Sequence, residues 1–153
     1  MTPSYDKEKL KEAQRVSLDI LLEIDRICRK NGIKYLMDAG TLLGAVRHQG
    51  FIPWDDDIDI AMTRENYERF KAIASRELKN GMELILPDSY NGGKAFYDFT
   101  PRIIYLKSRR HEDSGEMEYY DGKLNHLWVD IFILDNIPDS TAADKITRLR
   151  QKI

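Results

Sequence analysis

The sequence is short of several features, and each shortage argues against a class of protein. It has a single cysteine, Cys28, so no disulfide can form within the chain and a disulfide-stapled fold is excluded. No apolar run approaches the length of about eighteen residues that a membrane span requires. Lys and Arg number 24 against 26 Asp and Glu, and this near balance, a net charge of -2, disfavours a dedicated nucleic-acid-binding protein.

The chain does contain enough apolar material for one core. Hydrophobic residues make up 42% of its 153 residues, and a chain of this size buries roughly two-thirds of its unfolded surface on folding. No internal repeat, low-complexity tract or Gly/Ser-rich linker divides it. The first residues are charged and carry no apolar signal segment. We therefore expect a single domain over residues 1–153 in a cytoplasmic protein.

Periodicity along the chain predicts both helices and strands. Apolar residues at three- and four-residue spacing predict a helix from about Asp6 to Asn31, ended by Gly32. A second helix is predicted from Thr63, as its cap, to about Leu78. A short helix is predicted between residues 38 and 47, and strands at Ile33 to Met37, Ile58 to Met62, Met82 to Leu86, Phe96 to Leu106 and Leu127 to Leu134. This order predicts an α+β (mixed α/β) fold.

The most informative segment is an acidic run centred on residue 57. Asp57 and Asp59 alternate with Ile58 and Ile60. In a strand, both carboxylates would therefore point to one face, about 7 Å apart, and both isoleucines to the other. Like charges this close repel each other unless a cation lies between them, and divalent cations such as Mg²⁺ prefer carboxylate oxygens. Asp57 and Asp59 are therefore candidate metal ligands.

Further aspartates lie near this pair or in a later strand. Asp55 and Asp56 follow a Pro-Trp dipeptide and are expected in a solvated turn. Asp130 lies within an apolar run, where a lone carboxylate needs a partner because its burial is costly. If the two predicted strands are neighbours, Asp130 completes a cluster of three carboxylates.

A segment with two glycines stands seventeen residues before Asp57. Gly40, Thr41 and Gly44 lie where a predicted strand passes into a helix. Glycine permits a close approach of the backbone to an anion, and N–H groups at a helix start can hold a phosphate, with the Thr41 hydroxyl as an additional donor.

Phosphate also needs fixed positive charge. Arg47 and His48 lie beside the glycine segment, and Arg102 lies in a predicted strand. Within that strand Arg102 is a stronger candidate than Lys107, because a planar guanidinium matches phosphate oxygens in a bidentate manner. The alternative for each residue is an ordinary solvated charge.

Together these motifs resemble a known family. A Gly-Thr pair at a helix start, an alternating aspartate strand and a later third carboxylate resemble the nucleotidyltransferase superfamily. More closely, the 25 residues from Asp38 to Met62 are similar to the signature of the LicD family, relatives of fukutin and fukutin-related protein. The segment from Asp130 to Asp135 resembles that family's Asp-Ile-Phe-Pro-Leu-Asp segment, with Ile133 in place of proline. The resemblance covers about Leu21 to Asp135.

The resemblance implies a nucleotidyltransferase-like core, a short mixed sheet flanked by helices, and a phosphotransferase activity. The implied reaction moves phosphocholine or a similar phospho-alcohol from a CDP-activated donor to a hydroxyl of a cell-surface glycan precursor, such as teichoic acid, lipopolysaccharide or capsule. Asp57 and Asp59 would hold Mg²⁺ or Mn²⁺, and Asp130 would be a further metal ligand or the base. Acceptors of this kind are often lipid-linked, which is compatible with peripheral contact at the inner membrane surface. Because family members usually continue further, we expect a C-terminally truncated chain.

Three alternatives remain open from the sequence. A glycosyltransferase also uses an Asp-x-Asp metal site, although only 56 residues precede Asp57 here. A haloacid-dehalogenase-type phosphatase expects Thr or Val where this chain has Ala61. The third alternative is a fragment that binds a metal or a partner without turnover.

Overall fold

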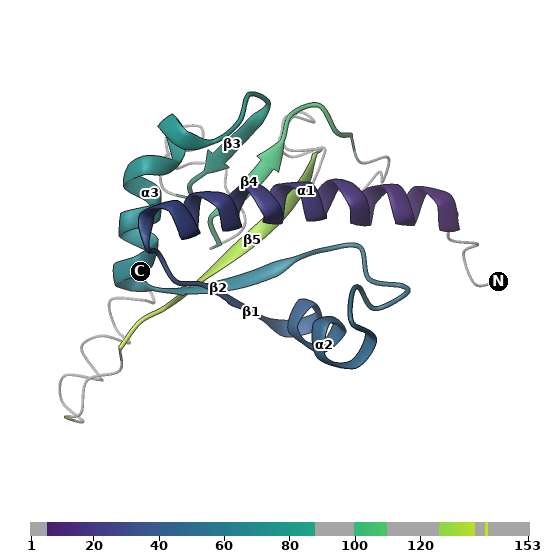
Figure 1. Ribbon diagram of the computed structural model, residues 1–153, viewed down its shortest axis with the longest axis horizontal. Helices are drawn as coiled ribbons and strands as arrows, with labels where there is room; N and C mark the ends of the chain where they lie inside the picture. Colours follow the sequence, from purple (N-terminus) through teal and green to yellow (C-terminus); the bar gives the residue numbers. More distant parts are fainter. Residues whose placement is uncertain (1–5, 88–99, 110–125, 137–139, 141–153) are drawn as a thin grey trace.

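The computed structural model of the protein describes residues 6–87, 100–109, 126–136 and 140. Three helices and five strands lie in these ranges (Figure 1). In chain order they are α1 (Lys7–Asn31), β1 (Leu36–Met37), α2 (Ala39–His48), β2 (Asp59–Thr63), α3 (Arg64–Glu77), β3 (Met82–Ile85), β4 (Arg102–Tyr105) and β5 (Leu127–Leu134).

The strands form one mixed sheet in the order β1-β2-β5-β4-β3. β2 and β5 run parallel, whereas the pairs β1 with β2, β4 with β5 and β3 with β4 are antiparallel. β5 therefore lies in the middle of the sheet, although it follows the other four strands in the sequence. The predicted fold class, a mixed sheet flanked by helices, is confirmed.

α1 begins and ends where the sequence predicts. The Asp6 side chain caps its start by accepting a hydrogen bond of 3.1 Å from the Glu8 N–H. Gly32 ends it with a φ of 61°, a left-handed conformation that suits glycine. Cys28 is buried on the inner face, and burial raises the pKa of its thiol to about 12. The thiol is therefore protonated at neutral pH and has a packing role.

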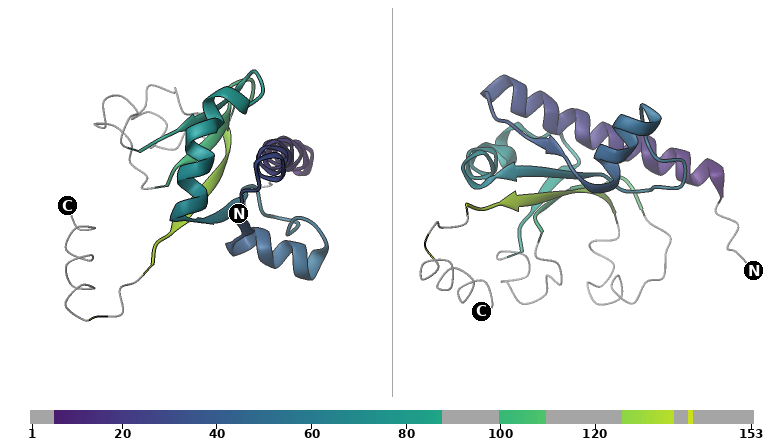
Figure 2. Two further views of the ribbon diagram at one scale, coloured as in Figure 1. Left: turned by 60° about the vertical axis from the view of Figure 1, so that its left-hand side comes forward. Right: turned by 90° about the horizontal axis from the view of Figure 1, so that it is seen from below.

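The two faces of the sheet have different chemistry. Ile58 and Ile60 are buried in a core with residues of α1 and α3, such as Ile24 and Phe70. Figure 2 shows α1 running along this side of the sheet. Because side chains alternate along a strand, Asp59 projects from the face opposite to Ile58 and Ile60. The isoleucines thus anchor the acidic strand, as the sequence predicts.

β1 is shorter than predicted. The expected strand from Ile33 to Met37 pairs only over Leu36 and Met37. The N–H of Ile33 donates instead to the Cys28 carbonyl at 2.9 Å, as part of the end of α1. The N–H of Lys34 donates to the Asn66 side chain at 3.0 Å. Backbone groups used for these contacts are not available to a strand ladder.

The predicted strand from Phe96 to Leu106 is observed from Arg102 to Tyr105. Its predicted first residues, 96–99, lie outside the described part of the chain. The predicted strands at Met82 to Leu86 and Leu127 to Leu134 are observed as β3 and β5, with β3 one residue shorter.

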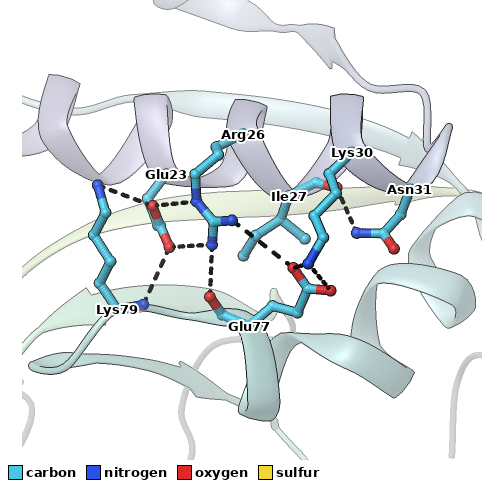
Figure 3. Close-up of polar contacts among 7 residues, drawn as sticks. All are labelled: Glu23, Arg26, Ile27, Lys30, Asn31, Glu77 and Lys79. Atoms are coloured by element: carbon cyan, nitrogen blue, oxygen red, sulfur yellow. Dashed lines mark hydrogen bonds and ion pairs between the residues drawn. The ribbon is translucent and has the colours of Figure 1, made fainter.

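A polar network joins the C-terminal half of α1 to the end of α3 and to the turn that follows it (Figure 3). At its centre the buried Glu23 carboxylate accepts two hydrogen bonds from Arg26, at 2.8 and 2.9 Å. The N–H of Lys79 donates to it at 3.1 Å, and the Lys79 ammonium lies 3.1 Å away. Arg26 also donates to the Glu77 carbonyl at 2.7 Å, and Lys30 pairs with the Glu77 carboxylate at 2.9 Å. The network fixes α1 and α3 relative to each other.

Candidate active site

Asp59 and Asp130 occupy neighbouring positions on the sheet. β2 and β5 are parallel neighbours, and Asp59 pairs with Asp130 in their register. Their backbones are therefore about 4.8 Å apart, and in-register side chains of parallel strands share one face. The sequence predicted a carboxylate cluster on the condition that these two strands are neighbours, and that condition is met.

Other carboxylates surround Asp59. Burial, and then the negative charges of Asp57, Asp130, Asp38 and Asp55 in that order, together raise the pKa of Asp59 to about 6. Four elements of structure thus bring negative charge to one place: the start of α2, the turn before β2, β2 itself and β5. Such a concentration of like charge is unfavourable in the protein alone and becomes favourable next to a cation.

The donor chemistry of this cluster fits a hard divalent cation, because Mg²⁺ and Mn²⁺ favour carboxylate oxygens. Within the described ranges, however, no three His, Cys, Asp or Glu side chains are already arranged to hold a metal ion. The ligand set Asp57, Asp59 and Asp130 therefore stays a prediction. What the structure shows is the shared face of Asp59 and Asp130 and the electrostatic effect of Asp57 on Asp59.

The turn before β2 is less solvated than expected. The N–H of Asp55 does donate to the Ile52 carbonyl at 3.0 Å, which makes the predicted turn, but Asp55 and Asp56 are half-buried. The side-chain amide of Gln14 on α1 donates to the Asp55 main-chain carbonyl at 2.8 Å and holds the turn against the helix, and the Asp55 carboxylate lies against Gly40 of α2. Burial first, and then the charge of Asp57, raise the pKa of Asp55. The predicted turn is confirmed, and its carboxylates are partly rather than fully exposed to solvent.

The start of α2 is fastened to the start of β2. Asp38 caps the helix, its carboxylate accepting from the Ala39 N–H at 2.9 Å. The Asp38 N–H donates to the Asp59 carbonyl at 3.0 Å, and the Thr41 hydroxyl oxygen accepts from the Asp59 N–H at 2.9 Å. Thr41 therefore holds the backbone of Asp59. Sequence reasoning did not single out Asp38, although an aspartate directly before a predicted helix is a typical cap.

The two glycines of α2 face inward and allow close packing. A Cβ on Gly44 would lie 2.5 Å from the Gly50 carbonyl oxygen, and one on Gly40 would lie 2.6 Å from the Asp55 carboxylate. The structure thus gives both glycines a packing role, and their predicted contact with a phosphate is not tested. With glycines inward, α2 presents its larger apolar side chains to the outside: Leu42, Leu43 and Val46 are exposed.

Arg47 and His48 lie at the opposite end of α2 from Asp38 and Thr41. A ten-residue helix is about 15 Å long, so these side chains are well separated from the carboxylates along the helix axis. Arg47 donates to His48 at 3.3 Å, and the His48 ring meets the exposed Trp54 ring edge-on at 6.5 Å. The structure does not bring this pair together with Asp59.

Arg102 is buried beside Asp130. Its Nε donates to Asp130 Oδ1 at 3.0 Å. On the other side of the carboxylate, the indole N–H of Trp128 donates to Oδ2 at 2.8 Å. Sequence reasoning assigned Arg102 to phosphate and did not consider Trp128. The signal for Trp128 was its place two residues before Asp130, since residues i and i+2 of a strand share a face.

A comparison with protein families agrees with this arrangement of motifs. Residues 32–153 match the family described as LicD/FKTN/FKRP, nucleotidyltransferase domain. That range contains the start of α2, the acidic strand and Asp130. The chain belongs to the LicD family.

The chain is also similar to individual proteins, among them members of this family. The chain is 34% identical to lipopolysaccharide cholinephosphotransferase LicD of Haemophilus influenzae over 138 residues, which are 87% of this chain and 47% of the relative. It is 36% identical to the uncharacterised protein RP689 of Rickettsia prowazekii over 115 residues, 71% of this chain and 43% of that one. It is 34% identical to human ribitol 5-phosphate transferase FKRP over 76 residues, half of this chain and 14% of the relative. The chain thus spans less than half of each of these relatives.

No helix in the described part of the chain has both the length and the apolar character needed to cross a bilayer.

Proposed function

We propose that this protein is a LicD-type phosphotransferase that moves phosphocholine, or a similar phospho-alcohol, from a CDP-activated donor to a hydroxyl group of a cell-surface glycan precursor. The acceptor would be a precursor of lipopolysaccharide, teichoic acid or capsule, free or lipid-linked. The observation that carries the proposal is the in-register pair Asp59 and Asp130 beside the Thr41 contact, in a chain whose family includes transferases named for cholinephosphate and ribitol 5-phosphate.

The reaction is a substitution at phosphorus. An acceptor hydroxyl oxygen forms a bond to the phosphorus that carries the alcohol, and the bond from that phosphorus to the bridging oxygen of the diphosphate breaks. CMP leaves with the bridging oxygen, and the hydroxyl proton passes to a base. Negative charge builds up on the bridging and non-bridging oxygens during this step.

The residues of the site match these needs. Asp57, Asp59 and Asp130 would hold the cation, or Asp130 would instead accept the hydroxyl proton. A bound Mg²⁺ or Mn²⁺ supplies the positive charge that offsets the growing negative charge on the diphosphate. Thr41 fixes the main chain of Asp59, and the N–H groups at the start of α2 are the proposed contact for the donor's phosphates, with Gly40 and Gly44 allowing α2 to pack closely beside the site. Arg47, His48 and Arg102 remain the predicted sources of positive charge for the donor.

We place the reaction in the cytoplasm, with peripheral contact at the inner membrane surface when the acceptor is lipid-linked. The exposed apolar face of α2, formed by Leu42, Leu43 and Val46, is compatible with such contact.

A donor screen with the purified chain tests the proposal. We expect Mg²⁺ together with CDP-choline to raise the melting temperature and to support release of CMP in the presence of a glycan acceptor. Asp59→Asn should abolish CMP release, whereas Asp19→Asn, which changes an exposed aspartate of α1, should not. A preference for UDP-sugars would instead establish the glycosyltransferase alternative. Binding of Mg²⁺ without turnover of any donor would indicate a non-catalytic domain.

A further inference from the structure

The carboxylate of Asp130 is held from two sides. Arg102 on β4 lies opposite Asp130 in the antiparallel register and donates to Oδ1 at 3.0 Å. Trp128 on β5 donates its indole N–H to Oδ2 at 2.8 Å. The guanidinium carbon of Arg102 lies 4.6 Å from the centre of the Trp128 ring, so a cation–π contact also links the two donors. We refer to this pair of donors as the Arg102–Trp128 clamp.

The clamp resolves an electrostatic conflict. Asp59 and Asp130 are neighbours in register, and like charges at such a position repel each other. An unrestrained Asp130 side chain would rotate away from Asp59. The side chains of Arg102 and Asp130 are only 8% and 17% exposed, so water screens their attraction weakly. Arg102 therefore offsets the charge of Asp130, and the two hydrogen bonds set the direction of its carboxylate.

The clamp is compatible with metal ligation by Asp130. An ionised carboxylate has about four lone-pair sites, and the clamp uses one on each oxygen. Carboxylates that ligate metals are commonly hydrogen-bonded by neighbouring groups, and loss of such a group typically costs about 10- to 100-fold in metal affinity or activity.

We propose that the Arg102–Trp128 clamp positions Asp130 to share a divalent cation with Asp59, which makes Arg102 and Trp128 positioning residues of the site. This inference rests on the proposed function for the presence of the cation. It gives Arg102 a role in addition to its predicted contact with phosphate, and it assigns a role to Trp128. It also favours ligation over proton acceptance for Asp130.

Trp128→Phe is the informative variant, because it keeps an aromatic ring beneath Arg102 and removes only the N–H donor to Asp130. Tyr35→Phe is the matched control, since it removes an O–H that donates to the Asp25 carboxylate at 3.0 Å from a residue outside the proposed site. Mn²⁺ affinity, measured by calorimetry, is the first readout. We expect it to fall about 10-fold or more in Trp128→Phe and to stay unchanged in Tyr35→Phe.

Turnover of CDP-choline is the second readout. Trp128→Phe should lower kcat and leave KM for the donor unchanged, because the indole N–H that it removes binds Asp130 and is not a predicted donor contact. Arg102→Lys keeps the charge but loses the planar guanidinium, and it should also weaken Mn²⁺ binding. If Trp128→Phe does not fold, Arg102→Lys takes its place in the test. Wild-type Mn²⁺ affinity in the folded variant would overturn the proposal.

The two proposals fail in different ways. If the wild-type protein binds Mn²⁺ but turns over no CDP-activated donor, the proposed function fails, and the clamp stands if Trp128→Phe weakens Mn²⁺ binding. If the wild-type protein binds no Mn²⁺, both fail. The protein has two tryptophans, so indole N–H signals in ¹⁵N spectra give a check without metal. Asp130→Asn should shift the Trp128 signal and leave that of the exposed Trp54 in place, and an unshifted Trp128 signal would contradict the contact.

Discussion

The hydroxyl oxygen of Thr41 accepts a hydrogen bond of 2.9 Å from the main-chain N–H of Asp59. The contact connects the first turn of α2 to the first residue of β2. It fixes the backbone at the point where the acidic strand begins, so the position of the Asp59 carboxylate depends on a side chain from another element.

Replacement of Thr41 should therefore affect both stability and the site. Thr41→Val keeps the size of the side chain but leaves the part-buried Asp59 N–H without its acceptor, which costs about 1–3 kcal/mol when no other acceptor replaces it. Thr41→Ser retains the hydroxyl and should stay within about 0.5 kcal/mol of wild type. Urea unfolding of the three proteins measures the difference. Equal stability of the Val and Ser variants would show that the hydrogen bond contributes nothing.

Gly44 should not tolerate even a methyl group. A Cβ there would lie 2.5 Å from the Gly50 carbonyl oxygen and 3.1 Å from the Ile52 nitrogen. Both are backbone atoms, so α2 would have to move away from the segment before β2. We expect Gly44→Ala to lower the free energy of unfolding by about 1–3 kcal/mol. Gly50→Ala is the matched control, because a Cβ at Gly50 meets no atom within 4 Å. A Gly44→Ala protein as stable as Gly50→Ala would contradict the packing seen here.

Glu23 is the centre of the network that joins α1 to α3. Its carboxylate is buried and accepts hydrogen bonds from Arg26 and from the Lys79 N–H. Glu23→Gln keeps the shape but replaces an acceptor oxygen by a donor that faces other donors, and should lower the free energy of unfolding by about 1–3 kcal/mol. The exposed pair of Glu12 with Arg15, at 3.7 Å, provides the control. Glu12→Gln should change stability by less than about 1 kcal/mol, and an equal effect of both variants would refute a special role for Glu23.

The contribution of Glu23 should also depend on pH. The hydrogen bonds from Arg26 hold the pKa of Glu23 below its ordinary value of 4.5, against the opposing effect of burial. A group whose pKa is lower in the folded than in the unfolded state stabilises the fold above the unfolded pKa and loses that contribution as pH falls towards the folded pKa. The stability difference between wild type and Glu23→Gln should therefore be constant near neutral pH and shrink below pH 4.5. Chemical unfolding at a series of pH values measures it, and a difference that grows on acidification would reverse the assigned sign.

Local signals predicted most of the fold. Asp6 and Gly32 mark the two ends of α1 with residues whose conformational preferences are strong, and Thr63 marks the start of α3 in the same way. The alternation of Ile58 and Ile60 with aspartates predicted which face of β2 is buried. These features depend on neighbours in the sequence, so the sequence displays them directly.

Contacts between distant segments were harder to predict. The position of Asp130 beside Asp59 depends on a parallel register between β2 and β5 that no local pattern specifies. The turn that contains Asp55 is held by a hydrogen bond from Gln14, forty-one residues earlier. To predict the pairing of Arg102 with Asp130, one would likewise have to know that β4 lies beside β5. The residue types of the site were therefore visible in the sequence, whereas the partners of each side chain were not.

The order of the strands has a consequence for the synthesis of the protein. β5 is made after the other four strands, yet it lies between β2 and β4. Until it is made, β2 and β4 each have an edge without its final partner, and such edges invite pairing with other chains. Pairing of segments so distant in the sequence is also slow. The nascent chain therefore carries Asp59 for some time before Asp130 can reach it, and the period between the emergence of β2 and the insertion of β5 is when the protein is most exposed to aggregation.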